Sequence, residues 1–394
     1  ISYDSSNKNC NAGDIDLIEY GKAKDNKGIP IFNLAIAFDK TNRVPLFYEE
    51  YPGSITDVSQ FVHMVDKVTE YGYKKVGFIL DRGYFSKDNI RYMEEGGYAF
   101  VIMVKGRKAL VSSLVEENRG TFETERDHSI RAYHVYGKTV KARLYEDDTQ
   151  DRYFHIYFNP SKHAAERERL ELTLDRFKIY MDKHIGDVVT SSKACQEYFT
   201  LKYDKAGHLV GYSERKDVIK RELDLCGYFC IVTSEEMTAS QALIHYKGRD
   251  VSEKLFSTDK SFIGSKSMRV QTTQALSAKI FVEFIALIVR NRMYNLLKET
   301  MLRLETKPNY MTVPAALREL EKIEMVRRGN GHYRLDHAVT KKQKTILSAF
   351  GLSDTDVKSI AIEIGSQLSG NQTPTDKAPE EDDDYGEDTF TIID

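Results

Sequence analysis

The order of apolar segments in the first hundred residues most restricts how this chain can fold. Apolar runs that alternate with polar turns predict strands, and apolar residues spaced three to four apart predict helices. The predicted elements are, in order, a strand ending at Asp4, a polar loop over 5–27, strands over 29–38 and 44–51, a helix over 57–71, a strand over 75–80, a helix over 87–95 and a strand over 98–104.

This order indicates the fold class. Three antiparallel strands followed by α/β units are typical of the ribonuclease H-like fold, an α/β mixed sheet flanked by helices. Its first and fourth strands are neighbours in the sheet. Asp4 on the first strand and Asp81 after the fourth are therefore expected to face each other.

The pattern changes after residue 107. Strands are predicted over 121–135, 138–145 and 152–159, then a charged helix over 161–183 and a hairpin over 198–213. The predicted parts are a core segment 1–107, a β-rich insertion 108–223, a second core segment 224–303, a small C-terminal unit 304–366 and a disordered acidic tail 367–394. The small unit could be winged-helix-like or a cap packed on the main body.

One apolar helix is predicted over 273–301, inside the second core segment. Its expected core-facing stripe consists of Ala275, Phe281, Phe284, Ile285, Ile288 and Met293.

Charge and composition allow a DNA partner. The formal net charge is −3, but residues 376–394 hold nine acidic residues and one lysine, so the remaining body is mildly basic.

The longest apolar run, 280–289, contains Glu283 and is too short to span a bilayer. Cysteines without zinc-ligand spacing predict buried free thiols in a reducing cytoplasm. The chain begins at Ile1, so we interpret it as a fragment whose upstream part is missing.

Two aspartates are candidate site residues. Asp81 follows an apolar strand and precedes Gly83, which would place it in the crevice where α/β sheets bind ligands. It could instead cap a turn, although Ser86 already supplies a cap for the next helix. Asp4 is favoured over Asp14 and Asp16 because it ends a strand, whereas the other two lie in the predicted loop.

A third carboxylate lies in the stretch 246–260. As a single helix, this stretch would place Tyr246, Arg249, Glu253 and Lys260 on one face. Surface helices often carry such charges. With Asp4 and Asp81, however, Glu253 would complete three carboxylates, which suit two magnesium ions acting on a phosphodiester.

These residues form a family pattern. The stretch 246–260 fits Y-x2-R-x3-E-x6-K, residues 81–84 fit D-x-G-[YF], and Asp4-Ser5-Ser6 resembles D-x-[ST]. With the flanking segments 20–25 and 46–54, the chain resembles DDE transposases of bacterial insertion sequences, in the insertion-sequence-four group with the Tyr-Arg-Glu-Lys motif. The resemblance extends from about Tyr3 to Leu352.

The resemblance implies a ribonuclease H-like core with a β-rich insertion between Asp81 and Glu253. It implies that Asp4, Asp81 and Glu253 bind two divalent ions, Mg²⁺ or Mn²⁺. It further implies that Tyr246, Arg249 and Lys260 hold phosphates near the transposon end. The implied reactions are nicking at the element ends and strand transfer into target DNA, often through a hairpin.

The implied partners are transposon-end and target DNA and a second copy of the chain, with no membrane. The implied location is the bacterial cytoplasm, in association with the nucleoid.

Two departures from the family pattern stand out. Relatives use a tryptophan of the insertion to stabilise a flipped base, and this chain has no tryptophan; Tyr198 or Phe199 could stack instead. The second departure concerns the family's end-recognition domain. This domain usually lies upstream of the first aspartate, in the part of the protein that we interpret as missing here. The alternatives are a ribonuclease H-like nuclease without strand transfer and a domesticated DNA-binding protein without catalysis.

Overall fold

The computed structural model describes the backbone of residues 1–370 except 13, 14, 25, 74, 106, 107, 190, 191, 262, 265, 266, 306–310, 328 and 330. Within helices, the side chains of 108, 251–253, 258, 259, 369 and 370 are also outside the described set. The chain divides into two compact units, Ile1–Ile288 and Val289–Asp394. The tail was predicted over 367–394, and its part from 371 to 394 lies outside the described residues.

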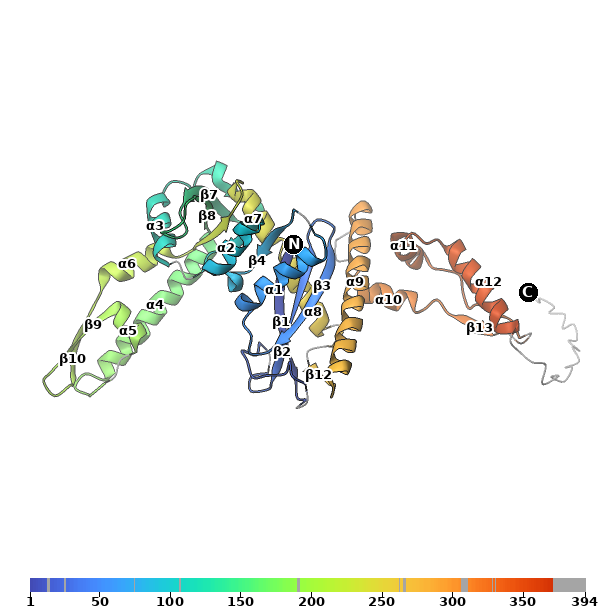
Figure 1. The fold of residues 1–394 in the computed structure, drawn as a ribbon, viewed down its shortest axis with the longest axis horizontal. Coiled ribbons are helices and arrows are strands. Elements are labelled where there is room, and N and C mark those ends of the chain that lie inside the picture. Colours follow the sequence, from blue (N-terminus) through green and yellow to red (C-terminus); the bar gives the residue numbers. More distant parts are fainter. Residues whose placement is uncertain are drawn as a thin grey trace, which may run out of the picture. The chain divides into compact units, whose positions relative to one another are not determined.

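The first unit is organised on a ten-stranded sheet with the strand order β3-β2-β1-β4-β5-β11-β8-β7-β6, and β12 pairs with β1 (Figure 1). Its strands are β1 (Ser2–Cys10), β2 (Ile31–Asp39), β3 (Val44–Pro52), β4 (Gly77–Leu80), β5 (Ala99–Met103), β6 (Ser129–Ile130), β7 (Val135–Ala142), β8 (Arg152–Phe158), β11 (Tyr228–Thr233) and β12 (Ser267–Met268).

The first five strands confirm the predicted ribonuclease H-like class. Strands β1, β2 and β3 are antiparallel neighbours, whereas β4 runs parallel to β1 and β5 runs parallel to β4. Tyr3 pairs with Leu80. The residues that follow this pair are Asp4 and Asp81, so the predicted adjacency of the first and fourth strands is confirmed.

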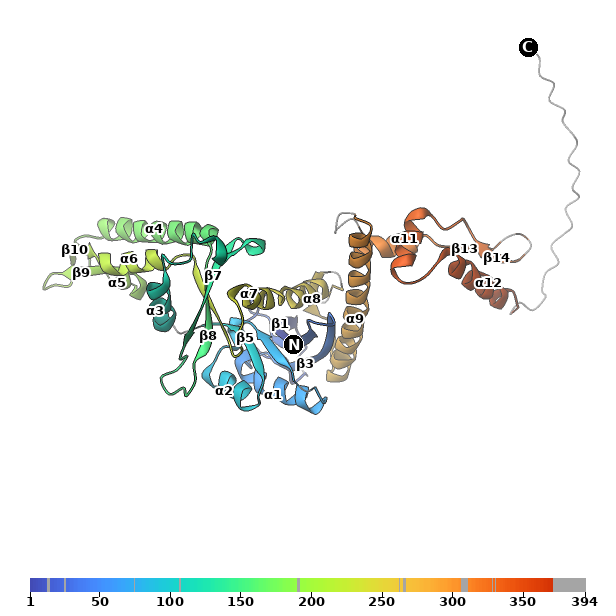
Figure 2. The same ribbon diagram turned by 90° about the horizontal axis from the view of Figure 1, so that it is seen from above.

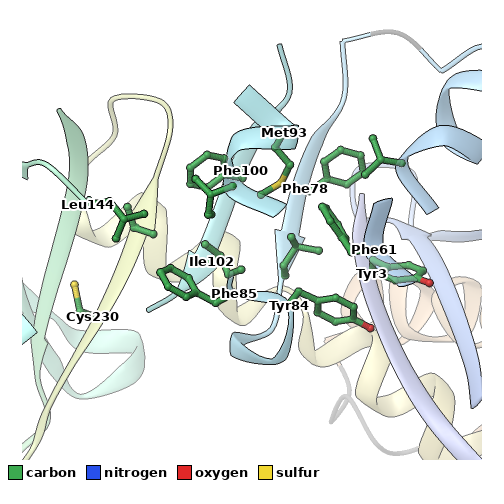
Figure 3. Packing of buried hydrophobic residues seen from close by; sticks show 14 of the residues in the cluster. Tyr3, Phe61, Phe78, Tyr84, Phe85, Met93, Phe100, Ile102, Leu144 and Cys230 are labelled. Carbon is green, nitrogen blue, oxygen red and sulfur yellow. The ribbon is translucent and has the colours of Figure 1, made fainter. Parts of the chain in front are cut away.

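Helices cover both faces of the sheet (Figure 2). One face carries α1 (Asp57–Glu70) and α2 (Lys87–Glu95), and the other carries α7 (Ala239–Lys247) and α8 (Asp250–Ser261). Alternation along β4 explains this layering, because successive strand residues point to opposite faces. Phe78 packs in the α1/α2 core, shown in Figure 3, while Ile79 packs with Leu243 of α7.

The region predicted as a β-rich insertion also contains helices. They are α3 (Lys108–Asn118), α4 (Pro160–Lys183), α5 (Lys193–Tyr198) and α6 (Lys216–Leu225), with the hairpin β9 (Phe199–Tyr203) and β10 (Leu209–Glu214). The strand predicted over 121–135 was wrong: within it, only Ser129–Ile130, between two short 3-10 turns, and Val135, the first residue of β7, are in strands. The hairpin and the long charged helix are confirmed.

Strand β1 continues six residues beyond the predicted end at Asp4, so the loop predicted from Ser5 was wrong at its start. The sequence there is polar, yet Asn7 and Asn9 are buried. Asn7 Nδ2 donates to Lys22 O, and Asn7 Oδ1 accepts from Lys24 N. Asn9 exchanges the same two bonds with Asn26. Side-chain amides thus meet the hydrogen-bonding requirement that burial imposes.

On the opposite face of β1, the buried charge of Lys8 is compensated by an ion pair. Lys8 Nζ lies 2.8 Å from Glu283 Oε2, and the two side chains are 0% and 8% exposed. Glu283 belongs to α9 (Thr273–Arg303), which confirms the predicted apolar helix. The predicted core stripe was partly wrong, because Phe281 and Ile285 are 55% and 44% exposed. Leu276, Ile280 and Leu287 are buried.

His155 joins three strands of the sheet. This fully buried side chain of β8 contacts Thr139 Oγ1 of β7 through Nδ1 at 2.9 Å and Thr233 Oγ1 of β11 through Nε2 at 3.0 Å. Thr233 donates its hydroxyl hydrogen to Glu235 O. Nε2 is therefore the donor to Thr233, and Nδ1 accepts from Thr139. Both ring nitrogens are satisfied in the neutral form.

Burial lowers the pKa of His155 from 6.5 to about 4. The unfolded chain then binds more protons between these values, so stability falls as the pH falls from about 6.5 to 4, by at most about 3 kcal/mol. Urea unfolding of His155→Gln across this range is expected to show a shallower pH dependence than the parent chain. An equally steep dependence in both proteins would contradict this prediction.

The second unit contains α10 (Val313–Leu320), β13 (Met325–Arg327), β14 (Tyr333–Leu335), α11 (Lys341–Ala349) and α12 (Asp354–Gly370). The predicted helices and hairpin are confirmed. Helix α12 was not predicted, and its last turn enters the range predicted as disordered. Ser353 and Asp356 form a reciprocal capping pair at its start, a pattern readable in the sequence.

Two further predictions can be checked. All four cysteines fall in the described part of the chain, are buried and form no disulfide, as predicted. No helix among the described residues is long and apolar enough to cross a membrane.

Candidate active site

Asp4 lies within β1, two residues after its start, and Asp81 directly follows the carboxyl end of β4, the adjacent parallel strand. Asp81 begins a 3-10 turn over Arg82–Tyr84 but makes no capping hydrogen bond. Ser86 caps α2 by accepting from Asn89 N, as expected. The Asp81 carboxylate is therefore not used for capping and remains 37% exposed, while that of Asp4 is 15% exposed.

The stretch 246–260 is not one helix. Helix α7 ends at Lys247, residues 248–249 form a turn, and α8 begins at Asp250. Lys40, in the turn after β2, donates to the Ile244 and His245 carbonyls at the end of α7. A Cβ on Gly248 would lie 2.2 Å from Lys40 Cε. The single-helix prediction was wrong because Lys40 caps α7 where Gly248 leaves room for it.

Helix α7 is firmly held against the sheet. Thr238 and Gln241 form a capping box at its start. Buried Tyr157 donates to Ala239 O at 2.7 Å. A Cβ on Gly137 of β7 would lie 2.9 Å from Ala239 Cβ, so glycine permits this close approach. These contacts direct the carboxyl end of α7, with Tyr246, to the carboxyl end of β4 and the neighbouring Asp4 of β1.

Tyr246 and Arg249 contact the two aspartates. Tyr246 Oη donates to Asp81 Oδ1 at 3.2 Å. Arg249 Nη1 lies 3.6 Å from Asp4 Oδ2, and its Nη2 lies 3.7 Å from Asp81 Oδ1. The guanidinium also lies 5.4 Å from the centre of the Tyr246 ring. The sequence did not predict these contacts, because they join residues far apart in the chain across the sheet.

Burial has the largest effect on the electrostatics of the site. Burial raises the pKa of Asp4 to about 6, the charges of Arg249 and Lys24 and the Ser5 N–H oppose this rise, and Asp81 adds to it. Burial and the nearby Asp81 carboxylate raise the pKa of Tyr246, so it is a neutral hydrogen-bond donor at physiological pH.

Two predicted site residues lie on α8. The backbone of Glu253 is in the first turn of this helix, which packs against β1, but its side chain is outside the described set. Lys260 lies in the last turn and is half-buried. Among the side chains that are described, no three His, Cys, Asp or Glu residues form a metal-binding group. Asp4 and Asp81 supply hard oxygen donors, which fit a magnesium or manganese ion.

Comparison with known families decides what kind of protein this is. The family model for the transposase DDE domain matches residues 11–289. The chain belongs to the DDE transposase family. The matched range includes Asp81, Tyr246, Arg249, Glu253 and Lys260, whereas Asp4 lies just before it.

Comparison with solved structures found a cryo-EM structure of a piggyBac transposase synaptic complex with hairpin DNA. The identity is 8% and the TM-score is 0.38, with 97% of this chain and 59% of that chain covered. This transposase chain therefore spans less than two thirds of the length of that protein. No curated protein matches the sequence.

Proposed function

We propose that this DDE transposase cleaves DNA at transposon ends and joins those ends to target DNA in a reaction that depends on divalent metal ions. The observation that carries the proposal is the meeting of Asp4 of β1 and Asp81, which follows β4, beside Tyr246 and Arg249. Both steps are phosphoryl transfers and can use one site, which needs no covalent enzyme adduct.

Asp4, Asp81 and Glu253 are the proposed ligands for two Mg²⁺ or Mn²⁺ ions. Bound ions of this kind activate an attacking oxygen and stabilise the leaving oxygen in an in-line displacement. The parallel strands preorganise the two aspartates, and Tyr246 orients Asp81 through its hydroxyl. Preorganised ligands lower the cost of arranging the site around the substrate.

Arg249 and Lys260 are the proposed contacts to phosphates near the transposon end, because cations bind phosphate oxygens strongly. Tyr246 was assigned the same role from the sequence. Its 5% exposure and its hydrogen bond to Asp81 support a role in holding Asp81 instead.

Other features of the proposal concern the whole protein. The chain is proposed to act as a homodimer on paired transposon ends, in the bacterial cytoplasm and in association with the nucleoid. The five-part division at residues 107, 223, 303 and 366 and the insertion-sequence-four assignment belong to the same proposal.

A strand-transfer assay tests this function. Duplexes with free 3′-hydroxyl ends and randomised terminal sequences are incubated with supercoiled plasmid and the protein in Mg²⁺ or Mn²⁺. Sequencing of joined products is expected to show insertion of selected ends into the plasmid, with none in EDTA. Shortened DNA without joined products would instead indicate a nuclease. DNA binding without cleavage in either metal would indicate a non-catalytic protein.

A further inference from the structure

Arg249 occupies an unexpected place for a residue assigned to DNA. Its two terminal nitrogens face different carboxylates, Asp4 at 3.6 Å and Asp81 at 3.7 Å. The side chain is only 12% exposed, and the guanidinium lies beside the ring of Tyr246. The positive charge therefore lies inside the acidic site in the DNA-free chain.

The contacts of Arg249 with the two aspartates are those of charges in proximity more than of directed hydrogen bonds. Both distances exceed the roughly 3.2 Å limit of ordinary N–H···O hydrogen bonds. Arg152 provides a contrast in the same chain, because its Nε and Nη2 lie 2.6 and 2.7 Å from the Glu94 carboxylate oxygens. Arg249 can thus leave its position without breaking short, well-directed hydrogen bonds to the aspartates.

A divalent ion would compete with this arrangement. Magnesium binds carboxylate oxygens at about 2.1 Å, so an ion on Asp4 and Asp81 would lie within a few ångströms of the guanidinium. Like charges at that separation repel, and the 12% exposure of the guanidinium limits the screening by water. The guanidinium in its observed position therefore weakens metal binding, and a bound metal ion destabilises that position of the guanidinium.

A DNA phosphate can resolve this competition. Arginine binds phosphate through paired, charge-assisted hydrogen bonds, which are shorter and stronger than the contacts of Arg249 with Asp4 and Asp81. A phosphate near the site would draw the guanidinium away from the carboxylates. Because coupling between two binding events is reciprocal, DNA that binds Arg249 would strengthen metal binding, and metal would strengthen DNA binding.

We propose that Arg249 is an internal counter-ion of Asp4 and Asp81 that keeps divalent metal out of the DNA-free site and releases the carboxylates when a DNA phosphate binds it. This inference rests on the proposed function, since it concerns the same metal site. Arg249 is then a positioning residue that makes metal loading depend on DNA. The chain would thereby avoid carrying an activated nucleophile when no DNA is bound.

Binding of Mn²⁺ to the full chain, followed by electron paramagnetic resonance without DNA, tests the proposal. Arg249→Met removes the charge and retains the length of the side chain, and it is expected to bind Mn²⁺ about tenfold more tightly than the parent chain. Arg249→Lys retains the charge and should stay near the parent. Arg82→Gln removes an exposed charge next to Asp81 and is expected to change the affinity by about twofold or less.

A second measurement adds a random-sequence duplex, with the Mn²⁺ bound by DNA alone subtracted. DNA is expected to tighten Mn²⁺ binding by the parent chain but not by Arg249→Met.

Equal or weaker Mn²⁺ binding by DNA-free Arg249→Met, with circular dichroism unchanged, would overturn the counter-ion role and leave the proposed function standing. If Arg249→Met fails to fold, equal tightening by DNA in the parent and Arg249→Lys supports the proposal, and no tightening in the parent overturns it. Absence of Mn²⁺ binding by the parent chain with DNA would overturn the proposed function itself.

Discussion

Asp81→Asn is expected to lower the rates of DNA cleavage and strand transfer at least about 1000-fold while leaving the fold intact. Asparagine has the same shape but lacks the negative charge that a divalent ion needs. Its amide oxygen can still accept the hydrogen bond from Tyr246 that Asp81 accepts now. Single-turnover cleavage and joining assays in Mg²⁺ would measure the loss, and thermal unfolding would confirm that the variant is folded.

Asp88→Asn is the matched control. It makes the same acid-to-amide change seven residues later, at an exposed position in α2 away from the site, and activity is expected to stay within about twofold of the parent. If Asp81→Asn cleaved and joined DNA at the parent rate, Asp81 could not be a metal ligand.

Lys8→Met is expected to lower the free energy of unfolding by about 3–5 kcal/mol. The substitution fills similar space but leaves the Glu283 carboxylate, 8% exposed, buried beside β1 without its cation. Removing the cation from a buried ion pair costs far more than removing it from a surface ion pair. For a unit of this size the melting temperature should fall by roughly 8–15 °C. Differential scanning calorimetry at neutral pH would measure the change.

Two comparisons make this expectation specific. The double variant Lys8→Met/Glu283→Leu removes both charges, and most of the lost stability should return. Lys87→Met breaks a pair with Asp147 in which both side chains are more than a third exposed, so its effect should be about 1 kcal/mol or less. Equal losses in Lys8→Met and Lys87→Met would show that burial does not set the strength of the Lys8–Glu283 contact.

The sequence predicted the sheet around the site more accurately than the site itself. Apolar periodicity was sufficient for β2 to β5 and the helices between them, because their burial patterns follow the periods of strand and helix. The same reasoning failed on β1 beyond Asp4. Asn7 and Asn9 are typical loop residues, and they can be buried in a strand because backbone partners 15 and 17 residues away accept their side-chain hydrogen bonds.

In the site, too, some features could be predicted from the sequence and others could not. Adjacency of Asp4 and Asp81 could be predicted because strand order determines it. The turn at Gly248 could not, since it depends on Lys40 reaching the end of α7 from a distant hairpin. The placement of Arg249 between two carboxylates also depends on that turn. Helical periodicity placed Arg249 near Tyr246, as the structure shows, but it could not predict the contacts of Arg249 with Asp4 and Asp81.

Strand β11 has a consequence for synthesis of the chain on the ribosome. It fills the place between β5 and β8 in the sheet, yet it follows both of them by many residues. Until Thr233 has left the exit tunnel, β5 and β8 each present an open edge, and the two acids at β1 and β4 have no arginine between them. A nascent transposase is therefore expected to gain its acidic pair early and its complete site only after α7 and α8 are made. Termination within the insertion would yield a product that contains both aspartates but lacks the helices that organise them.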